Sequence, residues 1–209
     1  MPPAEVGGDG GGDGGLASLH VLLTLRATSL PTHAGQVSLP GGHLLDGEDA
    51  SAAALREAGE ELGAHLPWAG GAPLARLPDA LAVTGTHVSV LLAACTAQRL
   101  ELARLAPPPD EVAAIFSLPL RALCDPARHG WRWHAARAGA APRGGLFLPT
   151  FDGGGPPERE VWGLTAWLLY DFLRTVVVPV AAASGRADER CLLGLRSPPP
   201  PPPPPPTTA

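Results

Sequence analysis

The chain has 209 residues, 45% of them apolar, which is enough for one domain with a buried core. Its 20 acidic residues outnumber 15 basic ones, all arginine, and the net charge of −5 gives no electrostatic basis for binding nucleic acid. The three cysteines are far apart, which argues against a disulfide framework or a cysteine metal site and favours an intracellular, reducing compartment. We expect no membrane partner, because no uninterrupted apolar run reaches transmembrane length.

The beginning of the chain divides into a leader and a strand. Residues 1–15 are rich in Gly and Asp, so we expect a disordered leader, with the folded domain covering residues 16–180. Leu19, Val21, Leu23 and Leu25 alternate along the next segment, which predicts a largely buried strand. Residues 27–41 are predicted to form a loop.

A helix is predicted to follow this loop. Asp49 or Ser51 can serve as its N-cap, an alanine-rich run propagates it, and Gly63 suits a left-handed end. One face of this helix carries apolar side chains that can be buried, Leu55, Ala58 and Leu62.

Further strands and one long helix are predicted in the rest of the chain, and together they favour an α/β class with an α/β/α sandwich around a mixed sheet. Residues 181–209 are expected to be a flexible tail. The predicted elements are strands at 81–83, 88–94, 115–118, 131–134 and 146–151, a helical turn at 120–124, and a helix over 164–178 that stops at Pro179.

The polyproline tract Pro198–Pro206 has two interpretations. Polyproline II segments bind aromatic grooves of SH3-like domains, and in one interpretation the tract binds a partner of this kind. The tract lacks basic residues at its far end, which favours an inert tail instead.

Three carboxylates on the first predicted helix point to metal chemistry. Glu57, Glu60 and Glu61 stand at i, i+3 and i+4 and therefore project from one face. Crowded carboxylates repel one another unless a cation lies between them, and Mg²⁺ bound through oxygen ligands fills that role. The alternative is an ordinary solvated helix, in which Arg56 pairs with Glu60.

The spacing of fixed residues favours the metal site. Gly42, five residues, Glu48, seven residues and then Arg56–Ala64 resemble the Nudix box, GX5EX7REUXEEXGU with U apolar. Every fixed letter is present, and only Ala64 is smaller than usual at the last apolar position. The resemblance implies the Nudix fold and hydrolysis of a diphosphate linkage with Mg²⁺ or Mn²⁺.

The segment before the box resembles the coenzyme A diphosphatase branch, whose motif is L(L/F)TXR(S/A)X3RX3GX3FPGG. Residues 22–27 and 35–42 match it, while Pro31 replaces its second Arg and Leu39 replaces its Phe. Downstream similarity to the same branch includes residues 161–166, where we interpret Trp162 as a core residue and Thr165 as a helix cap.

Roles for individual residues follow from this resemblance. Glu57 and Glu61 are expected metal ligands, with a backbone carbonyl of Gly41. Glu60 is a ligand or the general base, Glu111 is the alternative base, Arg56 orients a neighbouring Glu, and Glu48 adds a water-mediated contact. The residues expected at the substrate are Arg26, His33 and Gly42.

The implied substrate is coenzyme A or an acyl-CoA, cut to 3′,5′-ADP and the (acyl-)4′-phosphopantetheine. Because Pro31 and Leu39 depart from the motif, a second hypothesis is a Nudix enzyme that acts on ADP-ribose, NADH or a nucleoside triphosphate. A non-catalytic scaffold using the proline tract is a third hypothesis, against which the intact box argues. The compartment is mitochondrial by family resemblance or cytoplasmic.

Overall fold

A computed structural model of the chain describes residues 15–64, 66–95, 101–134 and 145–199. The predictions for residues 1–14 and for the proline tract beyond Pro199 lie outside these ranges. The described helices are α1 (Ala50–Leu62), α2 (Leu120–Leu123), α3 (Gly163–Phe172) and α4 (Val178–Ser184), with a π-helical turn at Leu173–Val177 and 3₁₀ turns at Leu16–Ser18, Ala69–Gly71, Leu102–Arg104, Pro126–Arg128, Pro157–Arg159 and Ala187–Leu193.

The described strands pair only in the antiparallel sense, where one mixed sheet was expected. They are β1 (His20–Arg26), β2 (Val37–Ser38), β3 (Ala75–Leu81), β4 (His87–Leu92), β5 (Val112–Pro119), β6 (His129–His134) and β7 (Leu146–Phe151). They form a sheet of order β2-β1-β5 and the two-stranded sheets β3-β4 and β6-β7. The five residues 82–86 join β3 to β4, and tight connections of this length produce antiparallel neighbours.

Two strands were predicted wrongly: β2 lies within residues 27–41, predicted as a loop, and β3 shares only Leu81 with the predicted strand 81–83. Strand β2 is only two residues long, too short to leave a periodic pattern in the sequence. Strand β3 begins at Ala75 rather than at Leu81 and contains Pro78, beside a shift of register between Leu77 and Ala80. Proline is accepted in strands at irregularities of this kind, so sequence patterns alone place such a strand badly.

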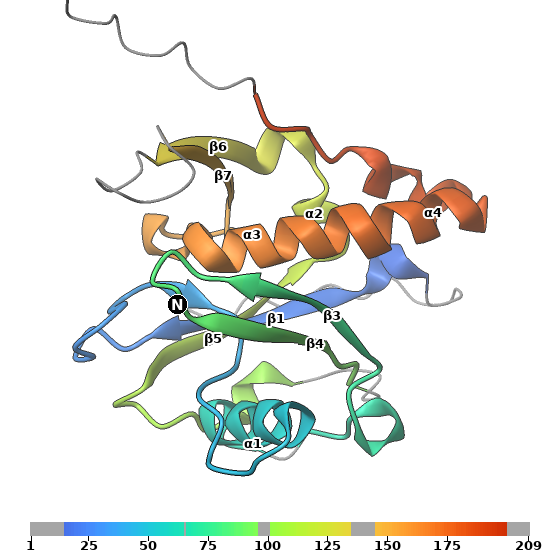
Figure 1. Cartoon of the computed structure of the whole chain (residues 1–209). Coiled ribbons are helices and arrows are strands. Elements are labelled where there is room, and N and C mark those ends of the chain that lie inside the picture. Colours follow the sequence, from blue (N-terminus) through green and yellow to red (C-terminus); the bar gives the residue numbers. More distant parts are fainter. Residues whose placement is uncertain (1–14, 65, 96–100, 135–144, 200–209) are drawn as a thin grey trace, which may run out of the picture.

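The α/β/α arrangement is confirmed. Helix α1 lies on one side of the β1-β5 and β3-β4 strands, and α3 with α4 lies on the other side (Figure 1). Successive side chains of β1 point alternately toward the α3 layer and toward α1. Leu23 is fully buried in the α3 layer, while Leu22 packs against α1.

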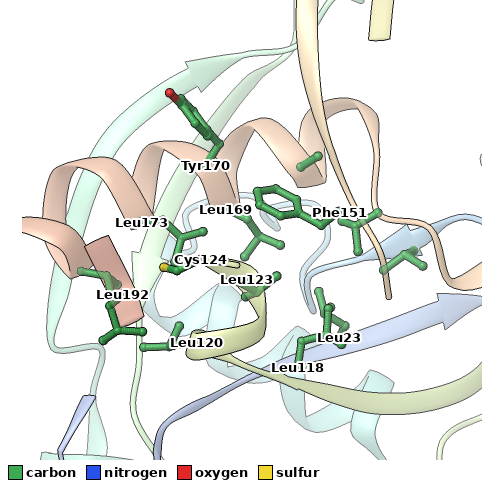
Figure 2. Close-up of a cluster of buried hydrophobic side chains, with 14 of the residues drawn as sticks. Leu23, Leu118, Leu120, Leu123, Cys124, Phe151, Leu169, Tyr170, Leu173 and Leu192 are labelled. Atoms are coloured by element: carbon green, nitrogen blue, oxygen red, sulfur yellow. The ribbon is translucent and has the colours of Figure 1, made fainter. Parts of the chain in front are cut away.

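The larger core lies between β1, β5 and α3. Leu23, Phe151 and Leu173 are among its fully buried side chains, and Figure 2 shows such residues converging from strands and helices. The predicted strands β1, β5, β6 and β7 therefore supply the sheet side of this core.

The predicted helix end at Pro179 is wrong. The helix continues to Ser184 through the π-helical turn Leu173–Val177, and Pro179 lies in the first turn of α4. A π turn shifts the hydrogen-bond ladder and so accommodates a residue that lacks an N–H. Beyond it, Ala181 and Leu192 are buried in the larger core, so packing extends past residue 180, where the tail was expected to begin.

The continuous helix Gly163–Ser184 is long and apolar enough to cross a membrane by length and composition alone, and the sequence pattern did not indicate this because Pro179 predicted an earlier end. One face of this helix is packed against the protein interior. The buried residues on that face follow helical spacing and are Ala166, Leu169, Tyr170, Leu173, Val177 and Ala181. Core helices meet the same length and hydropathy criteria.

Candidate active site

Both ends of α1 are determined by local chemistry. Of the two possible N-caps, the structure uses Asp49, whose carboxylate accepts hydrogen bonds from the N–H groups of Ser51 (2.9 Å) and Ala52 (3.3 Å). Gly63 ends the helix with φ +62°, and a methyl group there would also collide with the Ala106 carbonyl. Glycine is therefore required at this position for two reasons.

The apolar face of α1 sets the orientation of its glutamates. Ala58 and Leu62 are buried against Leu22 of β1 and Ile115 of β5. Because the helix is held by this face, its carboxylates project from the remaining surface. They differ in environment: Glu61 is 7% exposed, whereas the Glu60 side chain is 56% exposed.

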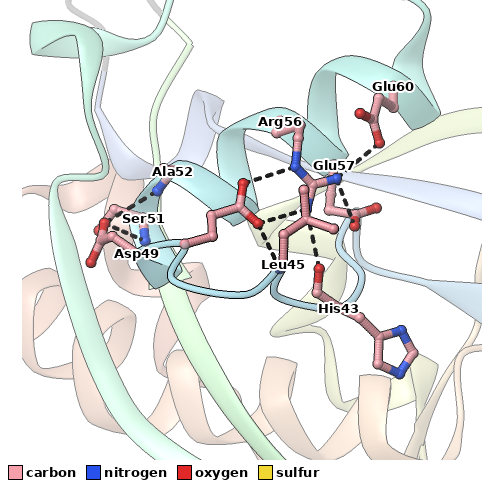
Figure 3. Close-up of polar contacts among 9 residues, drawn as sticks. His43, Leu45, Asp49, Ser51, Ala52, Arg56, Glu57 and Glu60 are labelled. Atoms are coloured by element: carbon pink, nitrogen blue, oxygen red, sulfur yellow. Dashed lines mark hydrogen bonds and ion pairs between the residues drawn. The ribbon is translucent and has the colours of Figure 1, made fainter.

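Arg56 is the centre of an ion-pair network (Figure 3). Its Nε and Nη2 donate to the two oxygens of Glu48 at 2.8 and 2.9 Å, and its Nη1 donates to Glu57 and Glu60 at 3.0 and 3.1 Å. Nη2 also donates to the His43 carbonyl at 3.1 Å. All five N–H donors of the guanidinium thus have an acceptor.

This network differs from the expectation for Glu48. Its carboxylate binds Arg56 through both oxygens and also accepts from the Leu45 N–H at 3.0 Å, so no oxygen is left without a partner. The hydrogen bonds from Arg56 hold the pKa of Glu48 at about 2. Glu48 is therefore a permanent anion that fixes Arg56, and the pKa of Arg56 is raised in return.

Glu61 is the most perturbed carboxyl group of the cluster. Burial raises its pKa to about 7, and the nearby carboxylates of Glu57 and Glu111 contribute in the same direction. A hydrogen bond from the Gly41 N–H (3.3 Å) and the positive charge of Arg26 oppose this rise. A buried acid surrounded by other acids indicates a place for a cation.

The loop Gly41–Gly42 contacts Glu57 and Glu61 of α1 directly. A methyl group on Gly42 would collide with the Glu57 carboxyl group, so a larger residue here would displace that carboxyl group. Gly41 donates to Glu61, as described above. The two glycines therefore contact two different carboxylates of α1.

The ends of β1 and β5 add Arg26 and Glu111. The pairing of these strands shifts by one residue after Leu25, so that Arg26 lies opposite Val112. Beyond the shift the Ala27 N–H donates to the Glu111 carbonyl at 2.9 Å. Bulges of this kind redirect side chains, and here two distant segments are placed beside Glu61. The Arg26 Nε is buried without a hydrogen-bond partner among the described residues.

His33 is the expected site residue with the least support. Its side chain is exposed and its Nδ1 lies 3.0 Å from Gln36 Oε1, within the same loop. Its φ of +55° reflects the turn in which it sits. The hydrogen bond to Gln36 joins His33 to its own loop rather than to the glutamates.

The donor set fits a hard divalent cation, although no ready-made cage of three or more ligating side chains occurs among the described residues. Glu57 and Glu60 each give one oxygen to Arg56, which holds them in place. Glu61, buried and beside Glu57, gains most from a positive charge. The expectation for Thr165 was wrong: it does not cap α3, and its hydroxyl reaches Val37 instead.

Comparison with known proteins identifies the family. Residues 12–138 match the NUDIX domain. The chain is 34% identical over 161 residues to the "Uncharacterized Nudix hydrolase NudL" of Shigella boydii serotype 4 (strain Sb227) and to proteins of the same name from Escherichia coli O1:K1 / APEC and Escherichia coli K12 (strain DH10B). Each of these alignments covers 71% of both chains. The chain therefore belongs to the Nudix hydrolase family.

Proposed function

We propose that this Nudix hydrolase is a coenzyme A diphosphatase, which cuts CoA or acyl-CoA to 3′,5′-ADP and the (acyl-)4′-phosphopantetheine. The observation that carries the proposal is the position of Arg26. This residue belongs to the segment that resembles the coenzyme A branch, and its charge acts on Glu61 inside the glutamate cluster. Its Nε is buried without a partner among the described residues, and the half-buried guanidinium would supply positive charge for a phosphate.

Nudix enzymes generally use a divalent metal such as Mg²⁺ or Mn²⁺, which neutralises phosphate charge and lowers the pKa of a bound water. In this chain Glu57 and Glu61 would hold it, with the Gly41 carbonyl. Glu57 is fixed by Arg56 on one side and by the close approach of Gly42 on the other. Glu61 is fixed by the Gly41 N–H.

The remaining residues divide between proton transfer and substrate binding. The Glu60 side chain is 56% exposed and binds Arg56 through Oε2, so its other oxygen would act as a further ligand or as the base that takes a proton from the attacking water. Glu111 lies close enough to influence Glu61 and is the alternative base. Water attacks a phosphorus of the diphosphate, the bridging P–O bond breaks, and the leaving phosphate takes the electron pair.

A second candidate is hydrolysis of another nucleoside diphosphate derivative. Pro31 stands where the coenzyme A motif has an arginine, and His33, the nearest alternative donor, is already hydrogen bonded to Gln36. One phosphate contact of the motif is therefore without its usual donor. This favours substrates such as ADP-ribose or NADH.

A direct comparison of substrates tests the proposal. The purified chain is incubated with Mg²⁺ and CoA, acetyl-CoA, ADP-ribose or NADH, and products are identified by mass. We expect CoA to give 3′,5′-ADP with the highest kcat/KM. A CoA rate well below that of ADP-ribose or NADH would exclude coenzyme A as the preferred substrate.

A pair of arginine variants then tests the assignment of Arg26. Arg26→Gln is expected to raise KM for CoA about tenfold or more, since charge-assisted hydrogen bonds contribute about 1.5–3 kcal/mol. Arg76→Gln is the matched control, because Arg76 pairs with Asp79 on the exposed strand β3. Equal effects of the two substitutions would argue against a phosphate contact by Arg26.

A further inference from the structure

A hydrogen bond joins the start of α3 to the strand that leads into the active site. The hydroxyl group of Thr165 donates to the backbone carbonyl of Val37 at 3.1 Å, across 128 positions of sequence. Thr165 lies in the first turn of α3, and Val37 lies in β2. Helix α3 is on the side of the sheet opposite α1 (Figure 1), so this bond connects the apolar layer with the segment that enters the glutamate cluster.

The placement of Thr165 is determined by its neighbours. Val161 is fully buried and exchanges two backbone hydrogen bonds of 2.9 Å with Phe151, which anchors the chain at the end of β7. Two residues later Gly163 has φ +66°, a left-handed conformation that turns the chain sharply into the helix. The direction of α3, and with it the position of the Thr165 hydroxyl, follows from these two constraints.

Val37 is a suitable point of attachment because β2 is an edge strand. The Gln36 carbonyl accepts the Arg26 N–H at 3.0 Å and so faces β1. Successive carbonyls along a strand point in opposite directions, hence the Val37 carbonyl faces away from β1. Thr165 supplies a donor to this outer edge.

Strand β2 continues directly into the loop Gly41–Gly42, which contacts the glutamates of α1. Only three residues separate Val37 from Gly41, whose N–H donates to Glu61, and the next residue, Gly42, lies against the Glu57 carboxyl group. A shift of β2 along β1 would therefore move both glycines relative to the two carboxylates. Only two residue pairs join β2 to β1, Thr24 with Ser38 and Leu25 with Val37. We expect so short a pairing to need a further contact to keep its register.

We propose that Thr165 is a positioning residue for metal binding: its hydroxyl holds β2 so that Gly41 and Gly42 keep Glu61 and Glu57 in place. The proposal rests on the assignment of Glu57 and Glu61 as metal ligands. It does not depend on which diphosphate is the substrate. Thr165 itself touches neither metal nor substrate.

The test is a titration of the full chain with Mn²⁺, in which free Mn²⁺ is followed by electron paramagnetic resonance. Thr165→Val keeps the shape of the side chain and removes the donor. We expect its dissociation constant for Mn²⁺ to rise about threefold to tenfold, which corresponds to the loss of one neutral hydrogen bond. Thr165→Ser retains the donor and is expected to restore binding to within about twofold of the natural chain.

Two controls separate positioning from general stability. Thr175→Val removes another hydroxyl of the same continuous helix, one that donates to the Asp171 carbonyl at 2.6 Å far along the helix from β2. It is expected to leave Mn²⁺ binding unchanged even if its melting temperature falls. Thr165→Ala, which favours the helix more than Val, serves as a second variant without the donor if Thr165→Val does not fold.

The proposal would be overturned if Thr165→Val bound Mn²⁺ as tightly as the natural chain. It would also be overturned if Thr165→Ser bound Mn²⁺ as weakly as Thr165→Val. The titration contains no substrate, so inactivity toward CoA leaves it unaffected. If instead the natural chain and Glu61→Gln bind Mn²⁺ equally, the assignment of the metal ligands fails, and this proposal fails with it for a distinguishable reason.

Discussion

The two sides of the β1-β5 sheet are stabilised by different interactions. On the α3 side, leucines, valines and aromatic rings from strands, helices and the turn Ala187–Leu193 are fully buried together. On the α1 side only a small cluster around Leu62 is apolar, and the helix carries Glu57 and Glu60, paired with Arg56, beside the buried Glu61. Figures 2 and 3 show the two environments.

This difference separates stability from function. Apolar burial on the α3 side stabilises the fold without any ligand. The α1 side holds a buried acid whose pKa is raised by burial and by neighbouring acids, an arrangement that costs stability unless a cation is bound. The network around Arg56 limits this cost by giving Glu48, Glu57 and Glu60 a common partner.

The largest effect on stability is expected on the α3 side, in the turn Ala187–Leu193. Leu192 is fully buried, so Leu192→Ala should lower the free energy of unfolding by about 2–5 kcal/mol. Leu193, its neighbour, is 46% exposed, and Leu193→Ala should change stability by less than about 0.5 kcal/mol. Chemical denaturation measures both. Similar small effects would mean that this turn is a tail rather than part of the domain.

The largest effect on activity is expected on the α1 side. Glu61→Gln keeps the size of the side chain and removes its negative charge, so hydrolysis should fall by more than about 100-fold, beyond the loss typical of an outer-sphere partner. Steady-state kinetics with Mg²⁺ measures this. Asp152→Asn, a change of the same kind in an exposed loop beyond β7, is the control and should stay near full activity. Full activity of Glu61→Gln would contradict the proposed site.

Glu61→Gln, which should lower activity, should stabilise the metal-free fold. The native pKa of Glu61 is about 7 against 4.5 for an ordinary glutamate, so the native state holds a proton that the unfolded chain has lost between these values. Stability of the metal-free protein should therefore fall as pH rises through this window and stay low above it. Glu61→Gln should remove this contribution.

Thermal unfolding with a chelator measures this effect at pH 5 and pH 8. We expect Glu61→Gln to melt a few degrees above the natural chain at pH 8, with a smaller difference at pH 5. Addition of Mg²⁺ at pH 8 should reduce the difference, because the metal stabilises only the chain with an intact carboxylate. A difference that does not change with pH would show that the effect does not come from ionisation of Glu61.

The smallest expected effect is at the start of α1. Asp49→Ala removes a cap that accepts two N–H groups and should cost about 1 kcal/mol. Because these hydrogen bonds of Asp49 involve the first turn of the helix rather than Arg56 or the glutamates, kcat should change little at a temperature where the variant is folded. Urea denaturation and steady-state kinetics on the same sample check both expectations. A loss of activity larger than the loss of folded protein would link the cap to the site.

Local signals predicted much of this structure. The cap at Asp49 or Ser51, the alanine run and the terminal glycine placed α1 within two residues of its observed bounds, since all three act over neighbouring residues. Strands β5, β6 and β7 were found from their apolar runs. The end of the continuous helix at Ser184 was missed because a proline normally stops a helix, whereas here a π turn precedes Pro179.

The sequence by itself determined the family and the glutamates of α1, because the spacing of the box is a property of one helix and the loop before it. Only the tertiary structure decided how these residues differ: Glu48 pairs with Arg56, Glu61 is buried beside Glu57 and Glu111, and Thr165 reaches Val37. The interactions of Glu61 with Glu111 and of Thr165 with Val37 join segments far apart in the chain, and burial and charge depend on every segment that packs nearby.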